Sequence, residues 1–278
     1  MKLSNAVKVL SRNRTDLSGQ PVSKGVSLER FRRCDNVGDY ISSVIFDWML
    51  EQRGLKAEDG KNAHLFGVGS ILGFSRADGV VWGSGILQPI YIRNIMLRRN
   101  YVRYDIRAVR GPITRDILAA AGYDCSRAVF GDPGILLPKI MEKPQTEKKY
   151  RYCVINHFDN ADFHKDRYRD TSVVSAGSND YRQFITSLCE AEIVISSSLH
   201  GIIFAEAYRI PAIWLLENME DRAMKYYDYY YATGRYSIPV ARSVEEAMEM
   251  EPIALPKNLE QMQADLIGAF PYDLWEKQ

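Results

Sequence analysis

The chain has 278 residues, of which 46% are hydrophobic and 26% are charged. This is the balance of an ordinary globular protein with a sizeable core, and the length fits two modest domains or one large domain. The formal net charge of +1 at pH 7 provides no global positive field, so nucleic acid is not expected as a partner.

The spacing of the cysteines and the lengths of the apolar runs indicate the cellular compartment. Four cysteines lie far apart and form no C-x-x-C pair: Cys34, Cys125, Cys153 and Cys189. This spacing argues against a disulfide scaffold or a structural zinc site and favours a reducing compartment. The first ten residues lack an apolar stretch of signal-peptide length, and no run approaches the roughly 18 apolar residues of a membrane span. We expect a cytoplasmic protein, and peripheral contact with the inner membrane stays open.

Residues 1–25 show no clear period, and from Val26 the pattern alternates between strands and helices. The apolar positions of residues 41–49 form one helical stripe, with Gly54 as the stop. A second helix is predicted from Pro112 to about Gly122, because proline suits the first turn and glycine suits the C-terminal cap. Short apolar runs predict strands, at residues 63–66, 79–82, 106–109 and 128–130.

A charged segment at residues 141–149, which contains a proline and almost no apolar residue, is the best candidate for a linker. A second series follows, with strands at 152–155, 172–174, 192–195 and 211–215 and helices at 180–190 and 201–208. Such alternation predicts parallel sheets flanked by helices. We therefore predict two α/β domains facing across a cleft, residues 1–143 and 144–278. The segment from about Asn258 is expected to return as a helix and pack on the first domain.

The run Ser196-Ser-Ser-Leu-His-Gly201 lies where a predicted parallel strand passes into a helix. Ligands of open α/β sheets bind at that edge, and a helix N-terminus offers unpaired N–H groups to an anion. Histidine is well suited to move a proton near neutral pH. His200 is thus the candidate catalytic residue, with Ser197, Ser198, Leu199 and Gly201 around a bound anion. Alternatively, the hydroxyls and the imidazole only satisfy backbone groups at a turn.

Three loops of the first half are candidates for a second ligand. Asn36 and Gly38 would let the backbone approach a substrate while Asp39 accepts from a sugar hydroxyl, although Asp39 could instead cap the helix. The glycine-rich strand ends Gly67-Val-Gly-Ser70 and Gly83-Ser-Gly85 would supply Gly69, Ser70 and Ser84 to one wall of the cleft, or serve only as tight turns. Their spacing does not fit a dinucleotide fingerprint, so we reject NAD.

Cations and donors for an anion are proposed at Arg110, His157 and Lys225. An arginine before a helix suits carboxylate or phosphate, but Arg110 could equally form a surface ion pair with Asp105 or Asp116. His157 could be satisfied by a backbone carbonyl. Asp132, within Gly131-Asp-Pro-Gly134, is first of all a turn residue. The tyrosine cluster at residues 226–231 favours packing, although Lys225 and Asp228 could still face the cleft. The motifs predict no metal ion.

In order and spacing, these segments resemble the polysaccharide pyruvyl transferase family. The resemblance spans roughly residues 34–235 and is closest to the branch that acts on bacterial exopolysaccharides such as succinoglycan. The segments that carry it are Asn36-Val-Gly-Asp39, Gly67-Val-Gly-Ser70, Trp82-Gly-Ser-Gly85, Ala108-Val-Arg-Gly111, Gly131-Asp-Pro133, the run 196–201 with Ala205 and Pro211, and residues 225–230.

The resemblance implies two Rossmann-like domains, similar to the two-domain (GT-B-like) glycosyltransferases. It also implies a reaction in which phosphoenolpyruvate, a co-substrate rather than a cofactor, gives its three-carbon unit to two hydroxyls of one sugar, forming a pyruvate ketal and phosphate. The family histidine corresponds to His200. Many members carry an arginine where this chain has Ser198, and some carry one at Asn156-His157. The resemblance therefore leaves the cation that holds the donor anion unassigned.

The leading hypothesis is a ketal pyruvyltransferase that acts on a lipid-linked oligosaccharide or polysaccharide at the inner membrane face. One alternative is a nucleotide-sugar glycosyltransferase with the same architecture. Another is a catalytically silent sugar-binding subunit of polysaccharide assembly, which the missing arginine at Ser198 keeps open.

Overall fold

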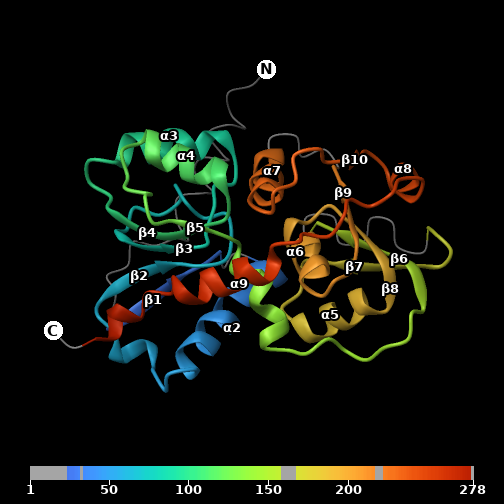
Figure 1. Cartoon of the computed structure of the whole chain (residues 1–278), viewed down its shortest axis with the longest axis horizontal. Helices are drawn as coiled ribbons and strands as arrows, with labels where there is room; N and C mark the ends of the chain where they lie inside the picture. The colour runs from blue at the N-terminus through green and yellow to red at the C-terminus, as the bar shows by residue number, and fades with distance from the viewer. Residues whose placement is uncertain (1–23, 32–33, 158–166, 217–221, 277–278) are drawn as a thin grey trace.

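The computed structural model describes residues 24–31, 34–157, 167–216 and 222–276. Most of the N-terminal segment without a pattern therefore lies outside the described residues. The chain forms two parallel five-stranded sheets (Figure 1). This confirms the predicted α/β class with two Rossmann-like domains, because each sheet alternates with helices in chain order.

The first sheet has the order β1-β2-β3-β4-β5, so its strands follow one another in space as in the sequence. Their bounds are β1 Val26–Glu29, β2 Ala63–Phe66, β3 Gly79–Trp82, β4 Tyr104–Val109 and β5 Val129–Phe130. The helices between them are α2 Val37–Glu51, α3 Pro89–Arg98 and α4 Pro112–Ala120. Proline occupies the first turn of α3 and of α4. Helix α3 was not predicted from the sequence.

The second sheet has the order β10-β9-β8-β6-β7. Its strands are β6 Tyr150–Asn156, β7 Thr171–Ser175, β8 Ala191–Ser196, β9 Ala212–Leu215 and β10 Val240–Ala241. The helices that follow β7 in the chain are α5 Tyr181–Cys189, α6 Leu199–Ala207, α7 Ala223–Ala232, α8 Val244–Met248 and α9 Leu259–Gly268. Helix α6 begins two residues before the predicted Gly201, so His200 lies in its first turn.

A 3₁₀ segment, η2 (Pro133–Lys139), carries the chain from the first sheet toward the second. Its side chains Ile135, Leu136 and Leu137 are fully buried in one hydrophobic cluster. That cluster also contains Ile41 of α2 and Phe204 of α6. The two sheets therefore share a continuous core.

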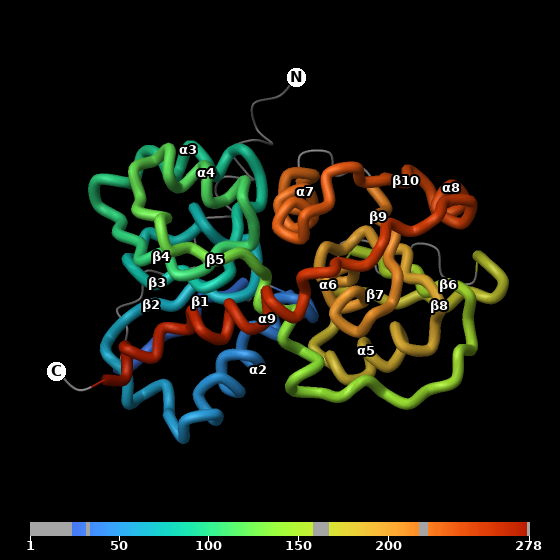
Figure 2. The backbone as a smooth tube through the Cα atoms, in the orientation of Figure 1, coloured from blue at the N-terminus to red at the C-terminus, as the bar shows by residue number. Residues whose placement is uncertain are grey.

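The end of the chain lies against the first half of the molecule. Helix α9 packs on β5 and η2, and the tube in Figure 2 shows it passing from the second half back toward β1. The indole Nε1 of Trp82 donates to the carbonyl of Leu266 at 2.8 Å. Beyond the helix, the Asp273 carboxylate pairs with Arg107 at 3.0 Å. These contacts place residues from both ends of the sequence around one sheet.

Candidate functional site

The serine run between β8 and α6 holds the loop that carries His200. The Ser196 hydroxyl donates to the Ser198 carbonyl and accepts from the Ser198 N–H. The Ser197 hydroxyl accepts the His157 N–H at 3.0 Å and donates to the Ile155 carbonyl. These two hydroxyls therefore satisfy backbone groups, as the alternative interpretation expected. Ser198 is the N-cap of α6 but makes no side-chain capping hydrogen bond, so the first-turn N–H groups lack the partner that a cap supplies.

His200 lies between elements of both halves of the molecule. Its Nε2 is 3.5 Å from Oδ2 of Asp132, and the exposed fractions of the two side chains are 13% and 1%. Its ring stacks on Phe204, with 5.6 Å between centroids. On the other side the ring meets Gly38 of α2, where an added Cβ would lie 1.8 Å from Nδ1. Gly38 thus makes room for the imidazole, and no side chain fits there without displacing it.

Asp132 has two roles that use different oxygens. Its Oδ1 accepts the Gly134 N–H at 2.9 Å and caps η2, which is the turn function the sequence indicates. Its buried Oδ2 and Nε2 of His200 have no hydrogen-bond partner within the described part of the chain. The carboxylate is therefore positioned to balance an imidazolium, at a separation slightly too long for a good hydrogen bond.

Asp39 lies in the first turn of α2, beside Gly69. An added Cβ at Gly69 would lie 3.0 Å from Oδ1 of Asp39. The expected capping role of Asp39 is wrong, because Oδ1 of Asn36 accepts the Gly38 N–H at 3.0 Å and caps the helix instead. Burial raises the pKa of Asp39 to about 6, and the charges of His200 and Lys225 partly oppose this rise. Asp39 therefore shares one electrostatic environment with both residues.

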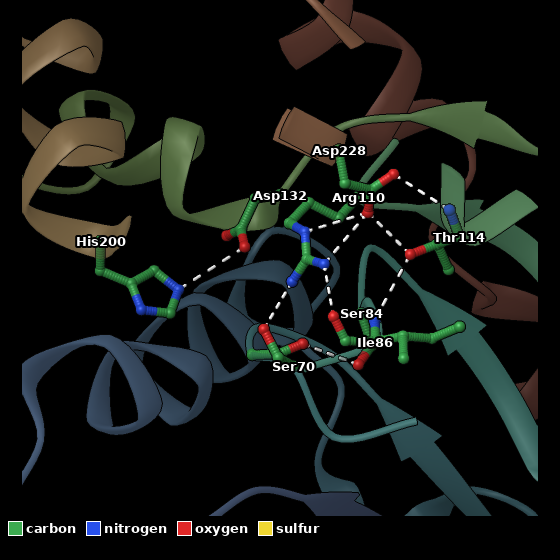
Figure 3. A network of polar contacts seen from close by, with 9 residues as sticks. Ser70, Ser84, Ile86, Arg110, Thr114, Asp132, His200 and Asp228 are labelled. Atoms are coloured by element: carbon green, nitrogen blue, oxygen red, sulfur yellow. Dashed lines mark hydrogen bonds and ion pairs between the residues drawn. The ribbon is translucent and has the colours of Figure 1, made fainter. Parts of the chain in front are cut away.

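Arg110 is fully buried, with 1% of its side chain exposed, and its guanidinium has partners on three sides (Figure 3). It donates to Asp228 of α7 at 3.1 Å, to the hydroxyl of Ser70, and to the carbonyl of Ile86 at 2.9 Å. The alternative of a surface ion pair between Arg110 and Asp105 or Asp116 is wrong, since those carboxylates pair with Arg107 and Arg115.

Asp228 completes this network from the second half of the molecule. Its carboxylate accepts from the Thr114 N–H at 3.0 Å and from the Thr114 hydroxyl at 2.7 Å. Gly111 allows the approach, because an added Cβ would lie 1.9 Å from the Asp228 carbonyl oxygen. The neighbouring Ser84 hydroxyl donates to the Gly69 carbonyl. Arg110 is therefore a positioning residue that fixes Ser70 and joins the halves, and we do not propose it as a ligand of the donor.

His157 lies buried at the end of β6, and its Nε2 is 3.5 Å from Nη1 of Arg222. Burial, together with the charges of Lys225 and Arg222, lowers the pKa of His157 to about 3. His157 is therefore uncharged near neutral pH, which corrects its expected role as a cation. Lys225, in the first turn of α7, is largely buried, with Nζ 5.1 Å from the centre of the Tyr226 ring. Arg222 and Lys225 are two cations at this edge.

The structure brings most of the predicted residues to one region and adds three. Asp132 was assigned to a turn, Asp228 to a packing cluster, and Arg222 was not singled out. A signal for Arg222 exists in its spacing, three positions before Lys225 at the start of the same helix. Across the residues that the structure describes, no group of three or more histidines, cysteines and carboxylates could hold a metal ion.

Comparison with known proteins identifies the family. A family model described as polysaccharide pyruvyl transferase matches residues 39–218, more than half of the chain. The chain belongs to the polysaccharide pyruvyl transferase family. The matched residues begin at Asp39 and include Asp132, His157 and His200, whereas Arg222 and Lys225 lie just beyond them.

Two further proteins are similar to this chain. An uncharacterized protein of Acanthamoeba polyphaga mimivirus is 30% identical over 184 residues, which are 60% of this chain and 59% of the relative. The chain thus matches less than two thirds of that relative's length. A crystal structure of an uncharacterized protein from Klebsiella pneumoniae subsp. pneumoniae NTUH-K2044 covers 87% of this chain and 100% of its own, with a TM-score of 0.50 and 12% identity, and so supports the fold alone. No helix in the described ranges has the length and apolarity to cross a membrane.

Proposed function

We propose that this protein transfers the pyruvyl unit of phosphoenolpyruvate to two hydroxyls of a sugar in an exopolysaccharide repeat unit, as in the succinoglycan-type branch that its motifs resemble. The products would be a cyclic pyruvate ketal and inorganic phosphate. The observation that carries the proposal is His200, which faces Asp132 and lies against the first turn of α2 beside Asp39, in a chain of this family.

The reaction needs proton transfers at two places. The methylene carbon of the donor gains a proton and becomes a methyl group, two C–O bonds form at the central carbon, and its bond to the phosphate oxygen breaks. The two sugar hydroxyls lose their protons. One of these protons restores the acid that protonated the methylene carbon, and the other leaves on the phosphate. We assign protonation of the methylene to His200, with Asp132 balancing the imidazolium, because histidine exchanges protons readily near neutral pH.

Asp39 is the base that we propose for the acceptor hydroxyl. A base works best when its pKa lies near the working pH, and burial raises the pKa of Asp39 to about 6. The neighbouring Gly69, Ser70 and Ser84 belong to loops tied together by hydrogen bonds. Ser70 and the capping side chain of Asn36, which are partly exposed, would form the wall on which the acceptor sugar rests, and buried Gly69 and Ser84 would support it from behind.

The pH dependence of activity tests the role of Asp39. We expect kcat/KM to fall as the pH drops below about 6, since protonated Asp39 cannot accept a proton. Ionising a carboxyl whose pKa is raised on folding costs stability, so that cost is absent near pH 4 and grows as the pH rises through 6. Asp39→Asn should therefore lose most activity, and its remaining kcat/KM should no longer fall below about pH 6. At neutral pH the variant should unfold at a higher temperature than the parent. An unchanged acidic limb in a folded, active Asp39→Asn variant would assign it to another group.

Many family members carry an arginine at the position of Ser198, and some carry one at Asn156-His157. For the donor, we propose that the first turn of α6 and the cations at the start of α7 bind the anionic groups in place of those arginines. The N–H groups at Leu199, His200 and Gly201 would bind one anionic group. Lys225 and Arg222 would bind the other. Uncharged His157 would orient Arg222 through the contact between Nε2 and Nη1.

Calorimetric titration of phosphoenolpyruvate tests this placement. Lys225→Ala is expected to weaken binding by about 2–5 kcal/mol, the range for removing one side of a desolvated charge pair. Arg222→Ala, which is more exposed, should have a smaller effect, and His157→Ala a smaller one still. Lys56→Ala and Arg127→Ala, both exposed and in the first half of the molecule, are the matched controls. If Lys225→Ala and Arg222→Ala bind the donor like the parent, the anion site lies elsewhere, although the family membership stands.

The architecture also suits a nucleotide-sugar glycosyltransferase, which has two parallel sheets of this kind. Incubation with either donor and a panel of sugar acceptors separates the two activities. We expect phosphate release from phosphoenolpyruvate that depends on the acceptor, and no nucleotide release from nucleotide sugars. Nucleotide release alone would replace the proposed reaction, and binding of a sugar without either product would favour the silent subunit.

A further inference from the structure

Large exposed hydrophobic side chains are concentrated on one helix. Of the five found among the described residues, four lie on α3 and the turn after it, and Tyr236 is elsewhere. Their exposed fractions are 51% for Ile90, 40% for Met96, 63% for Leu97 and 62% for Tyr101. We call these four residues the α3 face. An apolar cluster of this size on an exposed helix marks a contact site.

The α3 face is distinct from the side of the helix that builds the core. Tyr91 and Ile95 are buried in the hydrophobic cluster of the first sheet. Ile90 and Leu97 are seven positions apart and therefore lie almost above one another, on the opposite side of the helix. The helix is thus apolar on both sides, and only one of them is covered within the described structure.

Helix α3 and the turn after it carry basic side chains and no acidic one. Between Gly79 and Tyr104 the sequence has four arginines, Arg93, Arg98, Arg99 and Arg103, and no acidic residue. Arg98 and Arg99 donate to backbone carbonyls, and exposed Arg103 pairs with Asp78 at 3.2 Å. Arg93 is exposed on the helix itself, next to the apolar stripe.

This combination identifies the kind of partner. Apolar and aromatic side chains beside arginines, on a helix that lies flat on a domain, suit the interface of an anionic lipid bilayer. A second copy of the chain fits less well, because a two-fold contact through this face would place Arg93 and its neighbours against the same charges.

We propose that the α3 face binds an anionic lipid surface. Helix α3 begins three residues after Ile86, whose carbonyl accepts from Arg110, so its first turn follows directly on the loop that holds the Arg110 network. Figure 1 shows α3 at the outer side of the first half, away from α8. The inference does not depend on the reaction proposed above, since lipid binding needs no substrate.

Sedimentation of the full chain with lipid vesicles tests the proposal. The parent should sediment with vesicles that contain phosphatidylglycerol but not with pure phosphatidylcholine, and added salt should weaken binding. The double variant Ile90→Ser/Leu97→Ser should reduce the partition coefficient by about tenfold or more. Arg93→Gln should reduce it about fivefold, the effect of one basic residue near an anionic surface.

The chain offers matched controls for both kinds of change. Tyr236→Ser removes a hydrophobic side chain that is 72% exposed, and Arg169→Gln removes an exposed arginine just before β7, in the second half of the molecule. Both should bind vesicles like the parent, and all variants should keep the parent's unfolding temperature. Failure of the parent to bind anionic vesicles overturns the proposal. So does equal loss of binding in Tyr236→Ser, or a concentration-dependent dimer that the double variant abolishes.

Discussion

Replacing His200 by alanine is expected to lower kcat by about 10² to 10⁴, the contribution of a positioned proton-transfer group. The imidazole is held by Asp132, Phe204 and the space at Gly38, so its orientation is set before substrate binds. Rates of phosphate release from phosphoenolpyruvate, measured with saturating donor and acceptor, give the change in kcat directly.

The control for this prediction separates proton transfer from packing. His200→Asn keeps a polar side chain between α2 and α6 but cannot exchange a proton near neutral pH, so it should be as slow as the alanine variant. Asp132→Asn should slow the reaction less, and a double-mutant cycle with His200→Ala would measure their coupling. A folded His200→Ala protein with near-normal turnover would remove His200 from the proposed chemistry.

Removing one side of the Arg110–Asp228 pair is expected to have the largest effect on stability. Arg110→Ala leaves the Asp228 carboxylate buried with its charge unbalanced, and breaking such a pair costs about 3–5 kcal/mol. At roughly 2–4 °C per kcal/mol for a chain of this size, the unfolding temperature should fall by about 10 °C. Thermal unfolding followed by circular dichroism measures the shift.

An exposed pair in the same half of the molecule provides the matched control. Arg115 pairs with Asp116 at 2.8 Å on the surface, and Arg115→Ala should cost less than about 1 kcal/mol. The double variant Arg110→Ala/Asp228→Ala should be less destabilised than the sum of the single variants, since it leaves no lone buried charge. Equal unfolding temperatures for Arg110→Ala and Arg115→Ala would show that the buried pair contributes little.

The sequence predicted those elements whose signals are local. The strand β3 has its predicted bounds, and α4 begins at Pro112 as expected, because proline and apolar runs act within a few residues. Helix α3 was missed because apolar residues lie on both of its sides and arginines interrupt them, which leaves no single stripe. Helix α6 begins two residues before the predicted start because Ser198, the last of the three serines, is its N-cap, so that Leu199 and His200 already belong to the helix.

The sequence indicated many residues of the candidate site, but not their partners or charge states. His200 and Asp39 follow from the strand-to-helix pattern. The partner of Arg110 does not, because Asp228 lies 118 positions away and only the fold brings them together. The uncharged state of His157 depends on burial and on Arg222, which no local pattern shows. The turn sequence around Asp132 accounts for Oδ1, which accepts the Gly134 N–H, but gives no sign that Oδ2 faces His200.

The shared core through η2 limits how the molecule admits its substrates. Relative motion of two domains is the usual expectation unless the surface between them is large and apolar. Here, rotating the two halves away from each other would expose Ile135, Leu136 and Leu137 to water. We therefore expect the two halves to keep their relative position during turnover. Substrates would then enter by local rearrangement of surface loops. For the same reason, exchanging whole halves between relatives should yield poorly packed chimeras unless η2 and its neighbours on α2 and α6 are exchanged with them.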